Sequence, residues 1–173
     1  MNEWATIILM VLVGALMFAT AYYLLKLFFD NERNKRTWEF KAEHMKVTVP
    51  LRLQAYERMI LFLERMSPNS LIVRLQTPQM TARQLQMDML SLIRAEFEHN
   101  LAQQLYISKP AWDVIVNAKE NIIKIINLSA EEVDANAPYM ELSQKIMAHW
   151  LLLNPTPIRT AIDFLKDEAI QLF

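Results

Sequence analysis

A predominantly hydrophobic run extends from Ala5 to Leu25, and no residue in it carries a formal charge. A helix over these 21 residues rises about 30 Å, which matches the hydrocarbon core of a bilayer. A fully buried core helix is the alternative, but a small domain rarely surrounds such a helix on every side. A cleaved secretory signal would begin with basic residues, whereas this chain begins Met-Asn-Glu. We therefore predict an uncleaved transmembrane anchor over residues 1–25.

The residues that flank this run predict its orientation in the membrane. Trp4 at one edge and Tyr22 and Tyr23 at the other carry rings that favour the headgroup level, and Lys26 can extend its ammonium into the interface. Six Lys or Arg residues follow the run within positions 26–46, and none precedes it. The positive-inside rule then predicts a single-pass protein with its N-terminus outside and its C-terminal domain in the cytoplasm.

Residues 26–49 continue the helical pattern with polar residues. No Pro or Gly interrupts this stretch, and charges of both signs alternate along it, as in Glu32 and Arg36 at i,i+4 spacing. Six basic and four acidic residues between positions 26 and 46 leave a net charge of +2, which is weak for a lipid-binding patch. We predict a charged juxtamembrane helical stalk.

Amphipathic stripes of period 3.6 recur over residues 50–173 and predict four to five helices. Ser or Thr followed closely by Pro is typical of a helix start, and the expected N-caps are Thr77, Ser108 and Thr156. Ser129–Glu132 fits a capping box and predicts one short turn before a helix that starts near Pro138. The expected fold class is all-α: a single transmembrane helix, a helical stalk and a compact bundle of four to five amphipathic helices.

The composition excludes several function classes. The chain has no Cys and a single Gly, at position 14, so thiol nucleophiles, Cys-based metal sites, phosphate-binding Gly loops and nucleophile elbows are absent. Residues 47–173 carry twelve basic and fourteen acidic residues without a basic stripe, so we expect no nucleic-acid binding. We expect no cofactor, no catalytic residues and no enzymatic activity.

Glu96 and His99 are the weak candidates for metal ligands. Their i,i+3 spacing on a helix is the spacing of ferritin-like di-iron ligands. Such a site needs a second Glu–His pair and further glutamates from facing helices, and the sequence offers only half of this arrangement. A surface Glu–His pair is the favoured interpretation.

The methionines suggest a surface that binds a partner. Met side chains fill core gaps and also suit adaptable binding surfaces, and those of residues 80–92 cover more than one side of their helix. The candidate partner-binding residues are Leu71, Ile72, Val73, Met80, Met87 and Met89.

The layout resembles a known group of proteins. An N-terminal span, a Gly-poor helical domain, Thr-Pro at 77–78 and the segment Asn154-Pro155-Thr156-Pro157 are similar to small single-span membrane proteins of unknown function from Bacteroidota. The resemblance implies a bacterial inner (cytoplasmic) membrane and supplies no activity.

The sequence is compatible with three functions. The favoured one is an accessory or scaffold subunit, which is anchored in the lipid bilayer and binds another protein of a membrane complex. The alternatives are a membrane-displayed small enzyme or metal-binding helical domain, and a self-associating homo-oligomer.

Overall fold

The structure is a computed structural model that describes residues 3–171, without the side chains of residues 5, 34, 37, 41 and 42. The described residues form helices and no named strand, which confirms the all-helical class. The helices are α1 (Glu3–Arg65), α2 (Pro68–Leu75), α3 (Ala82–His99), the 3₁₀ helix η1 (Leu101–Leu105), α4 (Lys109–Glu131), α5 (Tyr139–Leu151) and α6 (Pro157–Ile170).

The chain divides into two compact units, Met1–Thr48 and Val49–Phe173. We call them the N-terminal unit and the C-terminal unit. We predicted a stalk over residues 26–49 and separate helices over residues 50–173, but α1 continues through Pro50 and belongs to both ranges. Within its described part, the C-terminal unit packs the end of α1 together with α2 to α6, which is more than the four to five helices expected.

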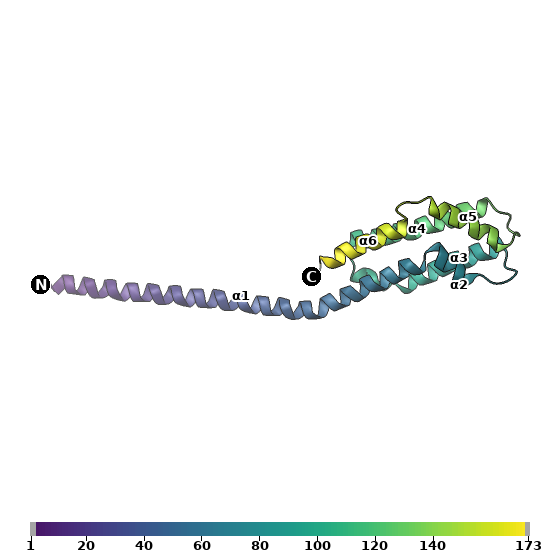
Figure 1. The fold of residues 1–173 in the computed structure, drawn as a ribbon. Coiled ribbons are helices and arrows are strands. Elements are labelled where there is room, and N and C mark those ends of the chain that lie inside the picture. The colour runs from purple at the N-terminus through teal and green to yellow at the C-terminus, as the bar shows by residue number, and fades with distance from the viewer. Residues whose placement is uncertain (1–2, 172–173) are drawn as a thin grey trace. The chain divides into compact units, whose positions relative to one another are not determined.

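Helix α4 lies at the centre of the C-terminal unit and packs against α3, α5 and α6 (Figure 1). Its buried face follows the period of a helix, with Ile115, Ile122 and Ile126 fully buried. Asp113, Asn117, Glu120 and Lys124 lie exposed on the opposite face. This helix therefore has the amphipathic pattern that the sequence predicts for residues 50–173.

Two of the three expected N-caps are confirmed. The Ser108 hydroxyl accepts a hydrogen bond from the backbone N–H of Ala111, and the Thr156 hydroxyl accepts one from Arg159, both at 3.2 Å. The predicted capping box at Ser129–Glu132 is wrong, because α4 continues to Glu131 and buries Ser129 in its last turn.

Thr77 is not an N-cap, because the chain turns at this point. The N–H of Met80 bonds the carbonyl of Thr77 at 3.2 Å, and Gln79 has φ 69°, so Thr77–Met80 is a turn with Pro78 at its second position. The third position of such a turn favours glycine, which this part of the chain lacks. Helix α3 begins four residues later than Thr77, where Thr81 and Gln84 form a capping box.

Replacing Thr81 with Ala should therefore lower the free energy of unfolding by about 1 kcal/mol, because the N–H of Gln84 loses its acceptor. Thr77→Ala is the matched control and should change it by about 0.5 kcal/mol at most. Both values are measured by urea unfolding of the full chain in mild detergent, followed by circular dichroism. A larger loss for Thr77→Ala would mean that α3 begins at Pro78.

Candidate docking sites on the C-terminal unit

The residues predicted to bind a partner do not form one surface. Leu71, Ile72 and Met89 are buried in the core at 9% exposure or less, so assigning them to a docking surface was wrong. They face inward because α2 packs on α3 and α5, which covers its apolar side. Met80 is half-buried against the same core. Val73 and Met87 alone of the six are largely exposed.

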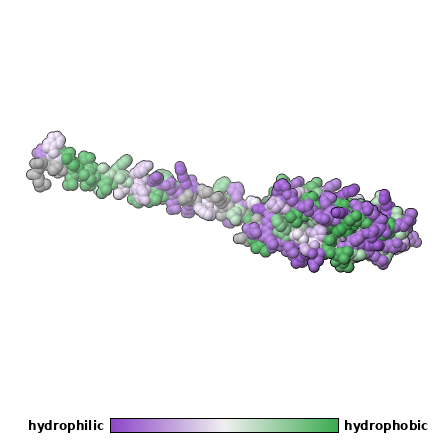
Figure 2. Space-filling view, turned by 90° about the horizontal axis from the view of Figure 1, so that it is seen from above, coloured by the Kyte–Doolittle hydropathy of each residue, from purple (hydrophilic) through white to green (hydrophobic). Residues whose placement is uncertain are grey.

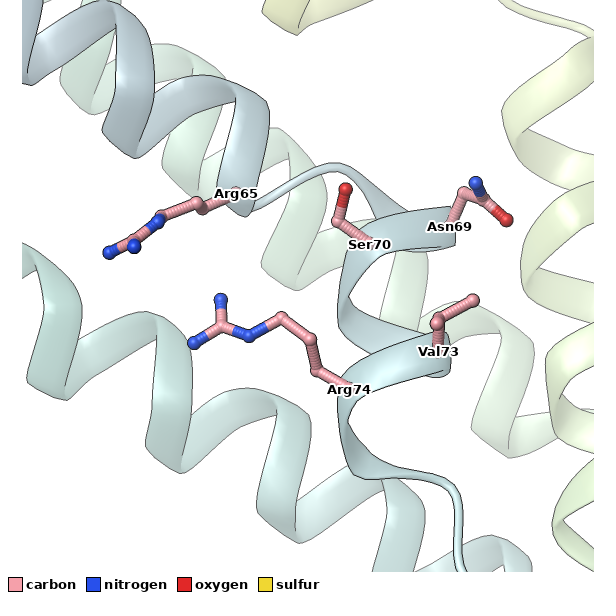
Figure 3. A pocket seen from close by; sticks show the side chains of 5 residues that line it. All are labelled: Arg65, Asn69, Ser70, Val73 and Arg74. Atoms are coloured by element: carbon pink, nitrogen blue, oxygen red, sulfur yellow. The ribbon is translucent and has the colours of Figure 1, made fainter.

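The Glu96 carboxylate forms ion pairs and does not face a ligand site. Its carboxylate lies 3.2 Å from the Arg74 guanidinium and 3.8 Å from that of Arg65, and its side chain is only 19% exposed. Figure 3 shows both guanidinium groups extending to the same side of a pocket, away from Asn69 and Val73. His99 is exposed and takes no part in these pairs. In the described part of the chain, no group of three or more His, Cys, Asp or Glu side chains is placed to hold a metal ion.

A Ser–His–Glu contact that the sequence did not indicate joins the C-terminal ends of α4 and α5. The Ser129 hydroxyl lies 2.9 Å from Nδ1 of His149, and Nε2 of His149 lies 3.2 Å from a Glu132 carboxylate oxygen. Lys145 donates to Glu132 at 3.0 Å, and this hydrogen bond lowers the pKa of the Glu132 carboxyl. Ser129 is completely buried, so its hydroxyl is not open to a substrate in this conformation. The contact ties two helix ends together.

An apolar hollow of the C-terminal unit lies between α1 and α6, and we call it the α1–α6 groove. Its volume is about 470 Å³ and its lining surface is apolar. Its α1 side is formed by Leu53, Tyr56, Glu57, Ile60 and Leu61, and its α6 side by Lys166, Ala169 and Ile170.

The groove has a buried floor and two exposed rims. Tyr56 is buried, while Ile60 and Ala169 are half-buried, so these three side chains form the floor. Leu53, Glu57 and Leu61 follow one another at i,i+4 spacing on the α1 rim, and Lys166 and Ile170 do so on the α6 rim. Each rim therefore carries both an apolar side chain and a charge.

The two rim charges have no partner among the described residues. Glu57 and Lys166 are exposed, and neither takes part in an ion pair or side-chain hydrogen bond of the described residues 3–171. Leu61 and Ile170 are 54% and 70% exposed, which leaves apolar surface in water beside these charges. Exposed apolar surface with a polar rim is typical of a protein-binding site.

A hydrogen-bond network connects α1 and α6, the two helices that form the groove. The Tyr56 hydroxyl donates to Glu168 at 2.6 Å, and the Ser108 hydroxyl donates to the other carboxylate oxygen at 2.8 Å. Glu168 thus links α1, α4 and α6. Burial raises the pKa of Tyr56 above its usual value, and the hydrogen bond and the negative charge of Glu168 raise it further.

This network predicts a loss of stability at alkaline pH. The unfolded chain releases the Tyr56 proton near pH 10, whereas the folded chain holds it to a higher pH, so the free energy of unfolding should fall as the pH rises above about 10. Tyr56→Phe should reduce this fall, as measured by urea unfolding between about pH 8 and pH 11. The wild-type chain is measured under the same conditions as the reference. An equal fall in the Tyr56→Phe variant would contradict the assignment.

Sequence reasoning missed the groove, although one signal was present. Leu53 belongs to the apolar pattern of its helix, yet it is 40% exposed. The stripe Leu53–Glu57–Leu61 is an apolar pattern interrupted by one charge, and this differs from the uninterrupted stripe that packs into the core. The sequence alone does not show that Lys166 and Ile170 lie across from it.

The N-terminal unit contains the predicted anchor. Among the described residues, α1 is the one helix long and apolar enough to cross a membrane, and none of its most apolar stretch is buried. Figure 2 shows this hydrophobic run followed by a hydrophilic one. The four side chains expected at the membrane interface, Trp4, Tyr22, Tyr23 and Lys26, are all exposed.

The comparisons with known proteins give a family but no activity. No curated protein and no solved structure matches the chain. A family model described as a family of unknown function matches residues 2–172. This agrees with the unknown function that the resemblance implied, while the single-span membrane layout and the Bacteroidota origin stay expectations. The chain belongs to the family of unknown function DUF7935.

Proposed function

We propose that this protein is a single-pass, membrane-anchored helical scaffold that binds another protein molecule through its C-terminal unit. The observation that carries the proposal is the α1–α6 groove, which combines an apolar floor with two unpaired charges on its rims. In this proposal the N-terminus lies outside a bacterial inner membrane, and the C-terminal unit is cytoplasmic.

The proposed mechanism is confinement of the chain to the membrane. A protein that is held on a membrane meets its partners at a raised effective concentration, so a modest interface suffices for a stable complex. Exposed apolar surface between two charged rims is the kind of surface that another protein molecule covers. In this proposal the chain contributes binding and no chemistry of its own.

The anchor is tested by extraction and by reporter fusions. The full chain should stay with the membrane fraction after alkaline carbonate extraction, and a C-terminal fusion to a reporter that works only in the cytoplasm should be active. Release by carbonate would refute the anchor. A silent C-terminal fusion together with an active N-terminal fusion would refute the orientation.

The groove is tested by two matched substitutions in the full chain. Leu61→Asp places a charge on the groove rim, whereas Leu128→Asp places the same charge on a comparably exposed Leu of α4. We expect Leu61→Asp to reduce the complex isolated in mild detergent at least about tenfold, since a single buried charge without a partner weakens an interface by more than 1.4 kcal/mol. Leu128→Asp should leave it intact. Equal behaviour of the two variants would rule out the groove as the docking site.

A further inference from the structure

We infer that the occupant of the α1–α6 groove is the same groove of a second copy of this chain, so that the protein is a homodimer. The inference rests on the proposed function, because it names the partner of the docking site proposed above. The supporting observation is the arrangement of charged and apolar side chains on the two rims. This arrangement is complementary to the same arrangement in a second copy.

The rim residues of the two helices lie at matching heights. Helix α6 runs in the opposite direction to the part of α1 beside it (Figure 1), and the hydrogen bond of 2.6 Å from Tyr56 to Glu168 fixes their register. Moving along both helices from this bond places Leu53 near the height of Ile170 and Glu57 near that of Lys166, in each case within about one helical turn. Each rim thus carries an apolar and a charged position at the same two levels.

Two grooves can meet face to face around a two-fold axis that runs either across or along the groove. An axis across the groove reverses the direction of one copy and brings α1 against α1. If this axis crosses at the level of the charges, Glu57 faces Glu57 and Lys166 faces Lys166, which is repulsive. If it crosses midway between the two levels, each charge faces an apolar side chain and still lacks a partner.

An axis along the groove keeps the direction and brings α1 of each copy against α6 of the other. Glu57 then faces Lys166 of the second copy, and Leu53 faces its Ile170, twice over because the interface is isologous. Both charges, which lack a partner among residues 3–171 of their own chain, gain one. The rim charges therefore select the axis that runs along the groove.

This arrangement also suits two anchored chains. An axis along the groove leaves both copies of Val49, the first residue of the C-terminal unit, at the same end of the dimer. Both N-terminal units then continue from that end, as two anchors in one bilayer require. Confinement to the bilayer compensates for the modest size of a single groove, because stable interfaces in solution usually bury about 800 Å² on each partner.

Charge reversal in the full chain tests the inference. We expect Glu57→Lys or Lys166→Glu alone to weaken the dimer about tenfold or more, since each turns two attractions into two repulsions. Glu57→Lys combined with Lys166→Glu should restore it to within about threefold of the wild type. The dimer is measured by light scattering of the protein in mild detergent and by its dilution into lipid, with Lys124→Glu on the exposed face of α4 as the control. Dimers that are weakened by neither Glu57→Lys alone nor Lys166→Glu alone would overturn the groove as the interface.

Cysteine cross-linking tests the direction of the axis, because the chain has no cysteine of its own. Two differently tagged copies, one carrying Glu57→Cys and the other Lys166→Cys, should form a mixed disulfide dimer on mild oxidation. Cross-linking of Glu57→Cys to itself as the main product would overturn the axis along the groove.

The same experiments separate this inference from the proposed function. If the chain is monomeric and Leu61→Asp still abolishes binding of a different protein, the homodimer is refuted and the docking site is retained. If the chain is monomeric and Leu61→Asp removes nothing, the docking site and the second copy both fail.

Discussion

Replacing Met89 with Asp is expected to unfold the C-terminal unit. Met89 on α3 is completely buried, and removal of such a side chain by Met→Ala already lowers the free energy of unfolding by about 2–5 kcal/mol. A carboxylate without a partner adds the free energy of taking a charge or a polar group out of water, about 2–7 kcal/mol for a polar group alone. The sum reaches the whole stability of a typical domain, about 5–15 kcal/mol.

Met87→Asp is the matched control for this prediction. Met87 lies two residues earlier on the same helix and is 57% exposed, so the same substitution should change the free energy of unfolding by about 0.5 kcal/mol or less. Circular dichroism and limited proteolysis of the full chain in mild detergent compare the two variants. Folded protein with Asp at position 89 would show that α3 does not bury this side and that Met89 lies on a surface after all.

Predictions of helices from the sequence succeeded where a local pattern decides the structure. Ser108 and Thr156 cap their helices through their own hydroxyl groups, and Ile115 and Ile122 follow the inward stripe of α4. Both features depend on residues within a few positions of each other along the chain.

Predictions failed where two local patterns compete. Thr77-Pro78 fits a helix start and also a tight turn, and the structure uses it as a turn because Thr81 provides the better cap. Contacts between distant segments add to this choice. The N–H of Ala82 bonds the carbonyl of Ala137 at 2.8 Å, which places the start of α3 against the start of α5. A pattern of single residues does not contain such a contact.

The α1–α6 groove could not be predicted from the sequence for the same reason. An apolar residue in a helix can face the core, a partner or water, and Met87 and Met89 show that neighbouring methionines can differ in this respect. The α1–α6 groove depends on Leu53 and Ile170 lying across from each other, although more than a hundred residues separate them in the chain. The register that brings them together depends on the bond from Tyr56 to Glu168.

Phe62→Ala should cause the largest loss of stability among simple truncations of the core, about 3–5 kcal/mol. Phe62 of α1 is 2% exposed and begins a stack of aromatic rings that crosses the C-terminal unit. Its ring centroid lies 5.8 Å from that of Phe97 on α3, which lies 5.5 Å from that of Trp112 on α4. The Lys119 ammonium lies 4.3 Å from the centroid of the Phe97 ring, within the range of a cation–π interaction.

The stack accounts for part of this loss, and a double-mutant cycle isolates that part. Phe62→Ala and Phe97→Ala should together cost less than the sum of the two single changes, with a coupling of about 0.5–1.5 kcal/mol, because each single change already removes the ring–ring contact. Phe164→Ala on α6 is the matched control, since its ring is 38% exposed and its removal should cost about 1 kcal/mol or less. The wild type and the four variants are compared by urea unfolding of the full chain. Strict additivity of Phe62→Ala and Phe97→Ala would show that α1 is held to α3 by burial of area alone, without a specific contribution from the rings.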